Sequence, residues 1–164
     1  MPSETTRSRT TITNEDYARL AAFRLLLRGF LHFSEEAAAE VGLTGQHYQA
    51  LLILRGWPPG QAMTIADLAQ QLFLKHNSAV GLVDRLASDG LLVRAPSNVD
   101  RRKVELRLTP RGSRLLARLA ERHRSELARI APELGAFFRQ LARQHVVSKE
   151  APAKPVRRRS NAGA

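Results

Sequence analysis

The sequence predicts a mainly α-helical chain with one small β-hairpin. Two short helical patterns, at about 64–72 and 76–89, follow each other closely. Two short runs with strand character, at about 91–95 and 103–108, come next and are joined by a polar, basic link. Further helical patterns flank this region on both sides. Helix, turn, helix and then a hairpin is the order of a winged helix-turn-helix.

The first helix is expected at about 15–40. Thr13 or Asn14 can cap it, and apolar residues then recur at helical spacing. Residues 1–12 are polar, and we expect them to be disordered. An apolar stripe on so long a helix needs a partner surface, and another subunit could supply it.

Two shorter helices are expected next, each with a recognisable start. Thr44 can cap a helix at about 45–55, which ends before a Trp-Pro-Pro-Gly break. Thr64 and Asp67 have the spacing of a capping box, which opens the helix at about 64–72. The start of the predicted helix-turn-helix is therefore fixed by local signals.

The helix at about 76–89 divides into two faces and ends at Gly90, where a helix C-cap is expected. Its apolar face, with Val80 at the edge, contains Ala79, Leu82, Val83, Leu86 and Ala87. Its polar face contains Asn77, Ser78, Gly81, Asp84, Arg85 and Ser88. Small hydrogen-bonding groups in the first two turns suit a helix that reads base edges in a major groove. Gly81 either permits close approach to DNA or avoids a clash with a neighbouring helix.

The second strand and the link before it form the predicted wing. Val104, Leu106 and Leu108 alternate with Glu105 and Arg107, which indicates a half-buried strand. The link at 95–103 is basic, and an arginine at a hairpin tip can enter a narrow minor groove. An aspartate there can hold such an arginine in place. The alternative is a solvated hairpin loop.

The runs LVDRLASDGLLVR at 82–94 and DRRKVELRLTPRG at 100–112 resemble the MarR (multiple antibiotic resistance regulator) family of bacterial transcription factors. That family combines a recognition helix, a wing with an Asp-x-Arg tip and a strand ending in Leu-Thr. The resemblance spans about residues 14–145 and implies dimers with intertwined terminal helices. It places Arg102 at the minor-groove arginine position. Many relatives carry a polar residue at the position of Gly81, so this chain departs from the pattern there.

We therefore expect double-stranded DNA to contact two groups of residues. Those of the recognition helix are Lys75, His76, Asn77, Ser78, Gly81 and Arg85. Those of the wing are Arg94, Ser97, Asp100, Arg101, Arg102 and Lys103. The resemblance also implies a cleft for a small aromatic or phenolic anion. It would draw on Arg24, His32, Phe33, His47 and Tyr48, and the alternative is ordinary packing or exposure of these side chains.

The C-terminal part is expected to be helical from Pro110, since Thr109 can act as its N-cap. Pro132 should end or kink this helix, with a last amphipathic segment to about 145. An arginine ridge on it is either a solvated face or a phosphate contact: Arg111, Arg114, Arg118 and Arg122. Residues 147–164 are expected to be a disordered basic tail, which is either a solubilising appendage or a nonspecific DNA contact.

We thus expect one domain at 13–146, with a DNA-binding lobe at about 44–109 and dimerisation helices at about 15–40 and 110–145. Of the net charge of +11, residues 149–164 carry +4 and residues 1–12 carry +1, so the body remains basic. A basic body favours nucleic acid as partner.

Motifs and residue types that the sequence lacks limit the functions to be considered. There is no cysteine, no apolar run long enough to span a membrane and no signal peptide, so a cytoplasmic protein is expected. No catalytic or phosphate-loop motif is present, and no two histidines have local metal-ligand spacing. We expect no enzymatic activity, no cofactor and no metal.

The sequence thus predicts a sequence-specific DNA-binding transcriptional regulator. The resemblance implies a homodimer on a palindromic operator and a small aromatic or anionic ligand that releases it. A repressor is expected, while an activator stays open because that depends on where the site lies relative to a promoter. Two alternatives remain: a low-specificity architectural DNA-binding protein without an effector, and a winged helix that binds protein instead of DNA.

Overall fold

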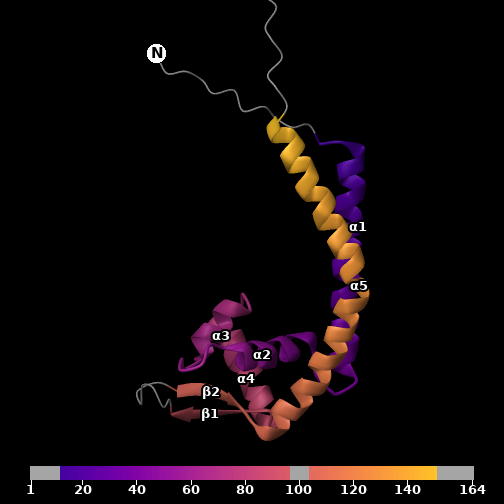
Figure 1. Ribbon diagram of the computed structural model, residues 1–164. Helices are drawn as coiled ribbons and strands as arrows, with labels where there is room; N and C mark the ends of the chain where they lie inside the picture. The colour runs from indigo at the N-terminus through magenta and orange to yellow at the C-terminus, as the bar shows by residue number, and fades with distance from the viewer. Residues whose placement is uncertain (1–11, 97–103, 151–164) are drawn as a thin grey trace, which may run out of the picture. The chain divides into compact units, whose positions relative to one another are not determined.

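The computed structural model describes residues 12–96 and 104–150, with side chains as far as residue 143. The elements in chain order are α1 (Asn14–Ala39), α2 (Gly45–Gly56), α3 (Ile65–Gln71), α4 (His76–Ser88), β1 (Leu92–Pro96), β2 (Val104–Leu108) and α5 (Pro110–Glu150) (Figure 1). A mainly helical chain with one two-stranded antiparallel hairpin confirms the predicted fold class.

The chain divides into two compact units. One runs from Leu25 to Ile130 and contains α2, α3, α4 and the hairpin. The other joins the residues up to Arg24 with those from Ala131 onward. Within this second unit the ring of Phe23 stacks on that of Phe137, with centroids 4.5 Å apart. None of the described helices is both long and apolar enough to cross a membrane.

Four helices in the described chain begin with a threonine whose hydroxyl accepts a hydrogen bond from the first helical turn. These caps are Thr13, Thr44, Thr64 and Thr109. In α2 and α3 the box is complete, because the side chains of His47 and Asp67 accept the N–H of the capping threonine in return. The predicted caps of these helices are confirmed, and each satisfies amide groups that would otherwise lack a partner.

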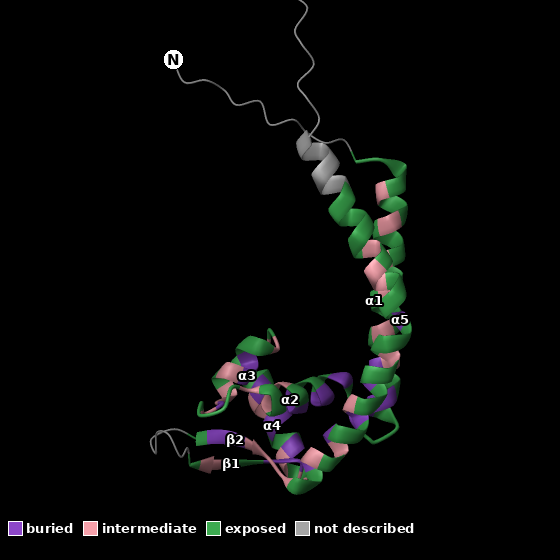
Figure 2. Ribbon diagram, in the orientation of Figure 1, coloured by how far each residue is buried: buried purple, intermediate pink, exposed green. Residues whose placement is uncertain are grey.

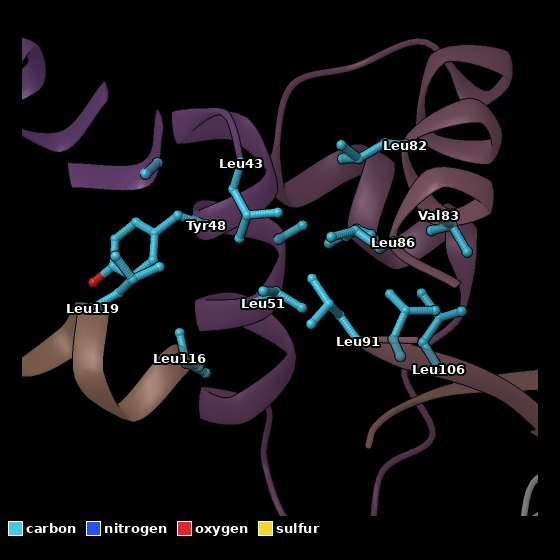
Figure 3. Close-up of a cluster of buried hydrophobic side chains, with 14 of the residues drawn as sticks. Leu43, Tyr48, Leu51, Leu82, Val83, Leu86, Leu91, Leu106, Leu116 and Leu119 are labelled. Atoms are coloured by element: carbon cyan, nitrogen blue, oxygen red, sulfur yellow. The ribbon is translucent and has the colours of Figure 1, made fainter. Parts of the chain in front are cut away.

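Buried side chains from α2, α4, α5 and the hairpin meet in one core (Figure 3). Leu51 of α2 and Leu86 of α4 are completely buried, and Leu91 and Leu116 are nearly so. Figure 2 shows buried residues concentrated where α2 and α4 lie against the hairpin. The predicted apolar face of α4 is confirmed, since its buried residues are Ala79, Leu82, Val83 and Leu86.

The strands pair in antiparallel register, with Leu92 opposite Leu108 and Pro96 opposite Val104. The other edge of β2 is also occupied, because the N–H of Leu106 donates to the carbonyl of Met63 at 2.8 Å. The hairpin is thereby joined through its backbone to the segment that leads into α3.

The expected alternation of β2 is only partly right. Leu106 is buried as predicted, but Val104 is 55% exposed and Glu105 is only 8% exposed. Val104 lies at the tip end of the strand, beyond the core. The Glu105 carboxylate can be buried because it forms an ion pair with the guanidinium of Arg107.

Pro132 does not end the last helix, and α5 continues through it to Glu150. Of the two expectations for Pro132, an end of the helix or a kink, the first is wrong. A proline removes one hydrogen bond to the carbonyl four residues earlier, here that of Ala128. Both residues are exposed, so water can satisfy that carbonyl.

The first turn of α5 lies so close to the start of the wing that it admits no side chain. A Cβ on Gly112 would lie 1.9 Å from the carbonyl oxygen of Leu91. We predict that Gly112→Ala lowers the free energy of unfolding by about 1–3 kcal/mol, since backbone must move to make room. Thermal denaturation measures this effect.

The matched control is Gly56→Ala at the end of α2, where an added Cβ would meet nothing within 4 Å. Its melting temperature should stay at or above that of the wild type. Equal melting temperatures for the two variants would contradict the close approach at Gly112.

Candidate nucleic-acid interface

The polar face of α4 is open to solvent. Lys75, His76, Asn77 and Ser78 are all exposed at its start, and Arg85 is exposed two turns later. The predicted recognition-helix residues therefore lie together along one helix, with Gly81 among them. The apolar face holds the helix in the core and leaves these groups free to meet a ligand.

The start of α4 differs from that of the other described helices. Its N-cap is Lys75, whose side chain makes no hydrogen bond to the first turn. No capping oxygen therefore offsets the partial positive charge of the α4 N-terminus, and the positive charge of Lys75 lies next to it. Such an end suits an anion, and a DNA phosphate is one.

Gly81 has space around it. A Cβ built at this position would meet nothing within 4 Å. Of the two explanations for this glycine, a clash with a neighbouring helix therefore has no support among the described residues. Close approach of the α4 backbone to DNA remains as a prediction.

An ion pair joins the first strand of the hairpin to α4. The guanidinium of Arg94 in β1 lies 2.7 Å from the carboxylate of Asp84 in α4. Both side chains are partly exposed, so the pair contributes at most about 1 kcal/mol to stability. Its effect is to orient Arg94. Sequence analysis placed Asp84 on the polar face but gave it no role, because no local spacing links it to a residue in the next strand.

The remaining wing residues of the prediction lie outside the described residues. These are Ser97, Asp100, Arg101, Arg102 and Lys103. Their assignment stays a prediction from the sequence.

The arginine ridge on α5 is not uniform. Arg111, Arg114 and Arg118 are exposed. Arg122 makes two hydrogen bonds to the carboxylate of Glu40, at 2.6 and 3.0 Å. This contact lowers the pKa of Glu40, because the Arg122 guanidinium bonds to the charged carboxylate. Arg122 thus has a partner within the chain.

Comparison with known proteins agrees with this geometry. The MarR family model matches residues 41–103, which run from the start of α2 into the wing. This part of the chain is therefore similar to the MarR family, and it contains the helix-turn-helix and hairpin described above. The HTH-type transcriptional regulator PecS of Dickeya dadantii (strain 3937) is 30% identical over 81 residues, which is 49% of this chain and 49% of PecS. The chain therefore matches about half the length of that curated relative.

Solved structures share the fold over most of the chain. AbsC, a MarR family transcriptional regulator from Streptomyces coelicolor, is 21% identical with a TM-score of 0.62, covering 85% of this chain and 99% of AbsC. RV1404 from Mycobacterium tuberculosis is 26% identical with a TM-score of 0.57, covering 90% and 100%. The similarity of fold thus includes the long helices that flank the region matched by the MarR family model.

The residues predicted to line a MarR-type ligand cleft do not all come together. Arg24 belongs to the second unit and is exposed. His32 is exposed and lies 3.3 Å from the carboxylate of Glu36. Phe33 and Tyr48, in contrast, both pack against one ring, that of His123. No group of three or more potential metal ligands occurs within the described chain.

His123 joins three helices and was missed by sequence analysis as a structural residue. Its Nδ1 donates to the carbonyl of Leu119 at 2.7 Å, since a carbonyl can only accept. Its Nε2 then accepts from the hydroxyl of Ser34 on α1, at 2.9 Å. Its ring stacks on Tyr48 of α2, with centroids 4.0 Å apart. The contact to Ser34 spans 89 positions, so no sequence pattern could have shown it.

His47 has a structural task that was also not predicted. Its Nδ1 accepts the N–H of Thr44 and completes the α2 capping box. Burial lowers the pKa of His47, and the nearby Arg85 cation lowers it further, whereas Asp89 opposes the shift. The capping role requires the neutral ring, so the shift and the hydrogen bond favour the same state.

We predict that the protein loses stability as the pH falls below about 6.5, the pKa of histidine in an unfolded chain. The unfolded state binds the proton first, because the folded-state pKa of His47 is lower. The lost contribution grows until the pH has passed through the folded-state pKa. Urea unfolding between pH 8 and pH 5 measures it.

The control is His47→Gln, which keeps an acceptor at the same position of the capping box but does not titrate. Its stability should fall less steeply over this pH range. Identical pH slopes for the two proteins would show that His47 is not responsible.

Proposed function

We propose that this MarR-family protein is a transcriptional regulator that binds double-stranded DNA through α4 and the wing. The observation that carries the proposal is the start of α4. Lys75 leaves it without a side-chain cap, and exposed polar residues follow at once. A cation beside an open helix N-terminus recognises phosphate, and the next groups can contact base edges in a major groove.

The charge distribution supports a polyanionic partner. The chain carries a net charge of +11. Between Asp67 and Asp84 no acidic residue occurs, and this interval contains the whole turn and the first two turns of α4. Arg85 then extends the basic character along the helix.

We propose further that the protein acts as a homodimer on a near-palindromic operator. Both long helices expose large apolar side chains that need a partner surface: Tyr17, Leu20, Leu25, Leu27 and Leu31 on α1, and Leu127, Phe138 and Leu141 on α5. Two recognition helices of a dimer would enter successive major grooves about 34 Å apart. Sedimentation of the purified protein tests the dimer.

Repression, and release by a small aromatic or phenolic anion, are finer parts of the proposal that rest on the family resemblance. A ligand weakens DNA binding only if it binds better to a state whose lobes do not match the operator. Titrating phenolic carboxylates into the protein–operator complex tests release. The family regulates transcription, and we propose no catalytic activity for this chain.

A second candidate is low-specificity, architectural DNA binding. The observation that favours it is Gly81, which removes a side chain from the middle of the reading face. Such a protein would bind all duplexes with a similar, steep salt dependence.

Selection of bound duplexes from a random pool at about physiological salt separates the two candidates, because nonspecific affinity is suppressed there. Enrichment of one near-palindrome supports the regulator. Binding without enrichment favours the architectural protein. Failure to bind any duplex would overturn both and favour a winged helix that binds protein.

We predict that Arg85→Ala weakens binding to the selected operator by about 1–3 kcal/mol, or roughly 5- to 150-fold, if this exposed arginine contacts a base. The loss should be smaller for random DNA. Fluorescence anisotropy with both duplexes measures the difference. Arg124→Ala, at an exposed position on α5, serves as the control and should leave both affinities unchanged. An equal loss of operator affinity for Arg85→Ala and Arg124→Ala would show that Arg85 is not part of the DNA interface.

We predict that Gly81→Ala stabilises the protein but weakens operator binding. Alanine favours the helix by about 1 kcal/mol, which corresponds to a rise of roughly 2–4 °C in melting temperature. The added Cβ meets nothing in the chain, so any loss of affinity arises at the DNA. Ser88→Ala, also exposed on α4, is the control and should not affect affinity. Unchanged operator binding by Gly81→Ala would refute close backbone approach.

A further inference from the structure

Phe73 occupies an unfavourable position in the turn between α3 and α4. Its side chain is 96% exposed. Its backbone has a φ of 54°, and no other non-glycine residue in the described chain has a positive φ. A ring that stays exposed contributes little hydrophobic stabilisation to the fold. A left-handed backbone conformation is also strained for any residue that has a Cβ.

Other helix ends in the same chain show what this position normally contains. After α3 the N–H of Leu74 donates to the carbonyl of Ala69, and that of Phe73 donates to Gln70. The ends of α1 and α4 have the same two bonds, with Gly42 and Gly90 at the left-handed position. This is a Schellman motif, for which glycine is the usual choice. The turn of the helix-turn-helix has phenylalanine instead.

The neighbours of Phe73 fix its orientation. Leu72 and Leu74 are partly buried and pack against the core. The turn therefore cannot rotate to bury the ring of Phe73 without exposing these two leucines. A strained residue that is held in place by its surroundings is a candidate for a functional contact.

The position of Phe73 indicates the partner. It lies two residues before Lys75, at the uncapped start of α4, in the interval that has no acidic residue. Among DNA groups, the faces of deoxyribose and the methyl of thymine are apolar and border the groove that a recognition helix enters. An apolar side chain beside a lysine matches a sugar or methyl group beside a phosphate.

We propose that Phe73 is a DNA-contacting residue whose ring packs against deoxyribose or a thymine methyl at the entry of α4 into the major groove. This inference rests on the proposed function. It explains why the turn keeps a strained, exposed aromatic residue where glycine would relieve the strain. Affinity for DNA is gained at the expense of stability.

The test compares Phe73→Gly with the wild type on the selected operator. The melting temperature should not fall, because relief of the left-handed strain offsets the greater freedom of glycine in the unfolded chain. Operator affinity should fall by about tenfold, as expected for the loss of a partly buried apolar contact. A merely structural role of the ring predicts the opposite result, with lower stability and unchanged affinity of the folded protein.

Lys75→Ala serves as the comparison for charge. It should reduce the slope of log K against log salt by about 0.9, as for one lost phosphate contact. Phe73→Gly should lower affinity without changing this slope, because no charge is removed. Phe73→Tyr keeps the ring and should retain most of the affinity.

Replacing each operator thymine with uracil separates the two apolar targets. A thymine contact predicts one position where uracil weakens the wild type but not Phe73→Gly. A deoxyribose contact predicts that no uracil substitution weakens the wild type selectively. Phe73→Gly should then bind every operator variant more weakly than the wild type does.

Three results would overturn the inference while leaving the proposed function intact, provided that the wild type binds the operator and Arg85→Ala weakens it. The first is unchanged operator affinity of Phe73→Gly. The second is a fall in its melting temperature. The third is a change in its oligomeric state alone, which would assign the ring to a protein contact. If the wild type selects no operator, the proposed function itself fails.

Discussion

The junction between the end of α4 and the start of α5 is the contact on which the predicted DNA-binding lobe depends. The hydroxyl of Thr109 donates to the carbonyl of Gly90 at 2.7 Å and accepts the N–H of Gly112. The N–H of Thr109 donates to the carbonyl of Leu91 at 3.1 Å. One residue therefore joins the end of α4, the start of β1, the end of β2 and the first turn of α5. Because Gly112 lacks a side chain, the backbones can approach this closely.

The helix starts of this fold could be predicted from the sequence because they are local. Thr64 and Asp67 are three residues apart, and the hydrogen bonds between them need no other part of the chain. Contacts between distant segments could not be predicted in this way. The burial of Glu105 depends on tertiary packing around β2, and the partner of His123 lies on α1. For the same reason, the apolar and polar faces of α4 could be predicted from the helical periodicity, whereas the ion pair of Arg94 with Asp84 could not.

Departures from the usual local rules are concentrated between Phe73 and Gly81, at the end of α3 and in the first half of α4. Lys75 replaces a capping residue, Gly81 lies inside a helix, and Phe73 takes a position that suits glycine. Each lowers stability, and none has a compensating contact among the described residues that would explain it. Elsewhere in the lobe the starts of α2 and α3 follow the rules closely, because Thr44 and Thr64 form complete capping boxes. Such a concentration is expected where a surface is shaped for a partner and not for the fold alone.

The same junction constrains how DNA binding could be regulated. The hairpin and α4 are joined at Thr109 and again by the ion pair of Asp84 and Arg94, so they form one packed unit. A ligand that distorted this unit internally would have to break packed core contacts around Leu91. Changing the distance between the two copies of this packed unit in the proposed dimer would break none of these core contacts. Differential affinity for dimers of different spacing is therefore the least costly route by which a small molecule could control operator binding.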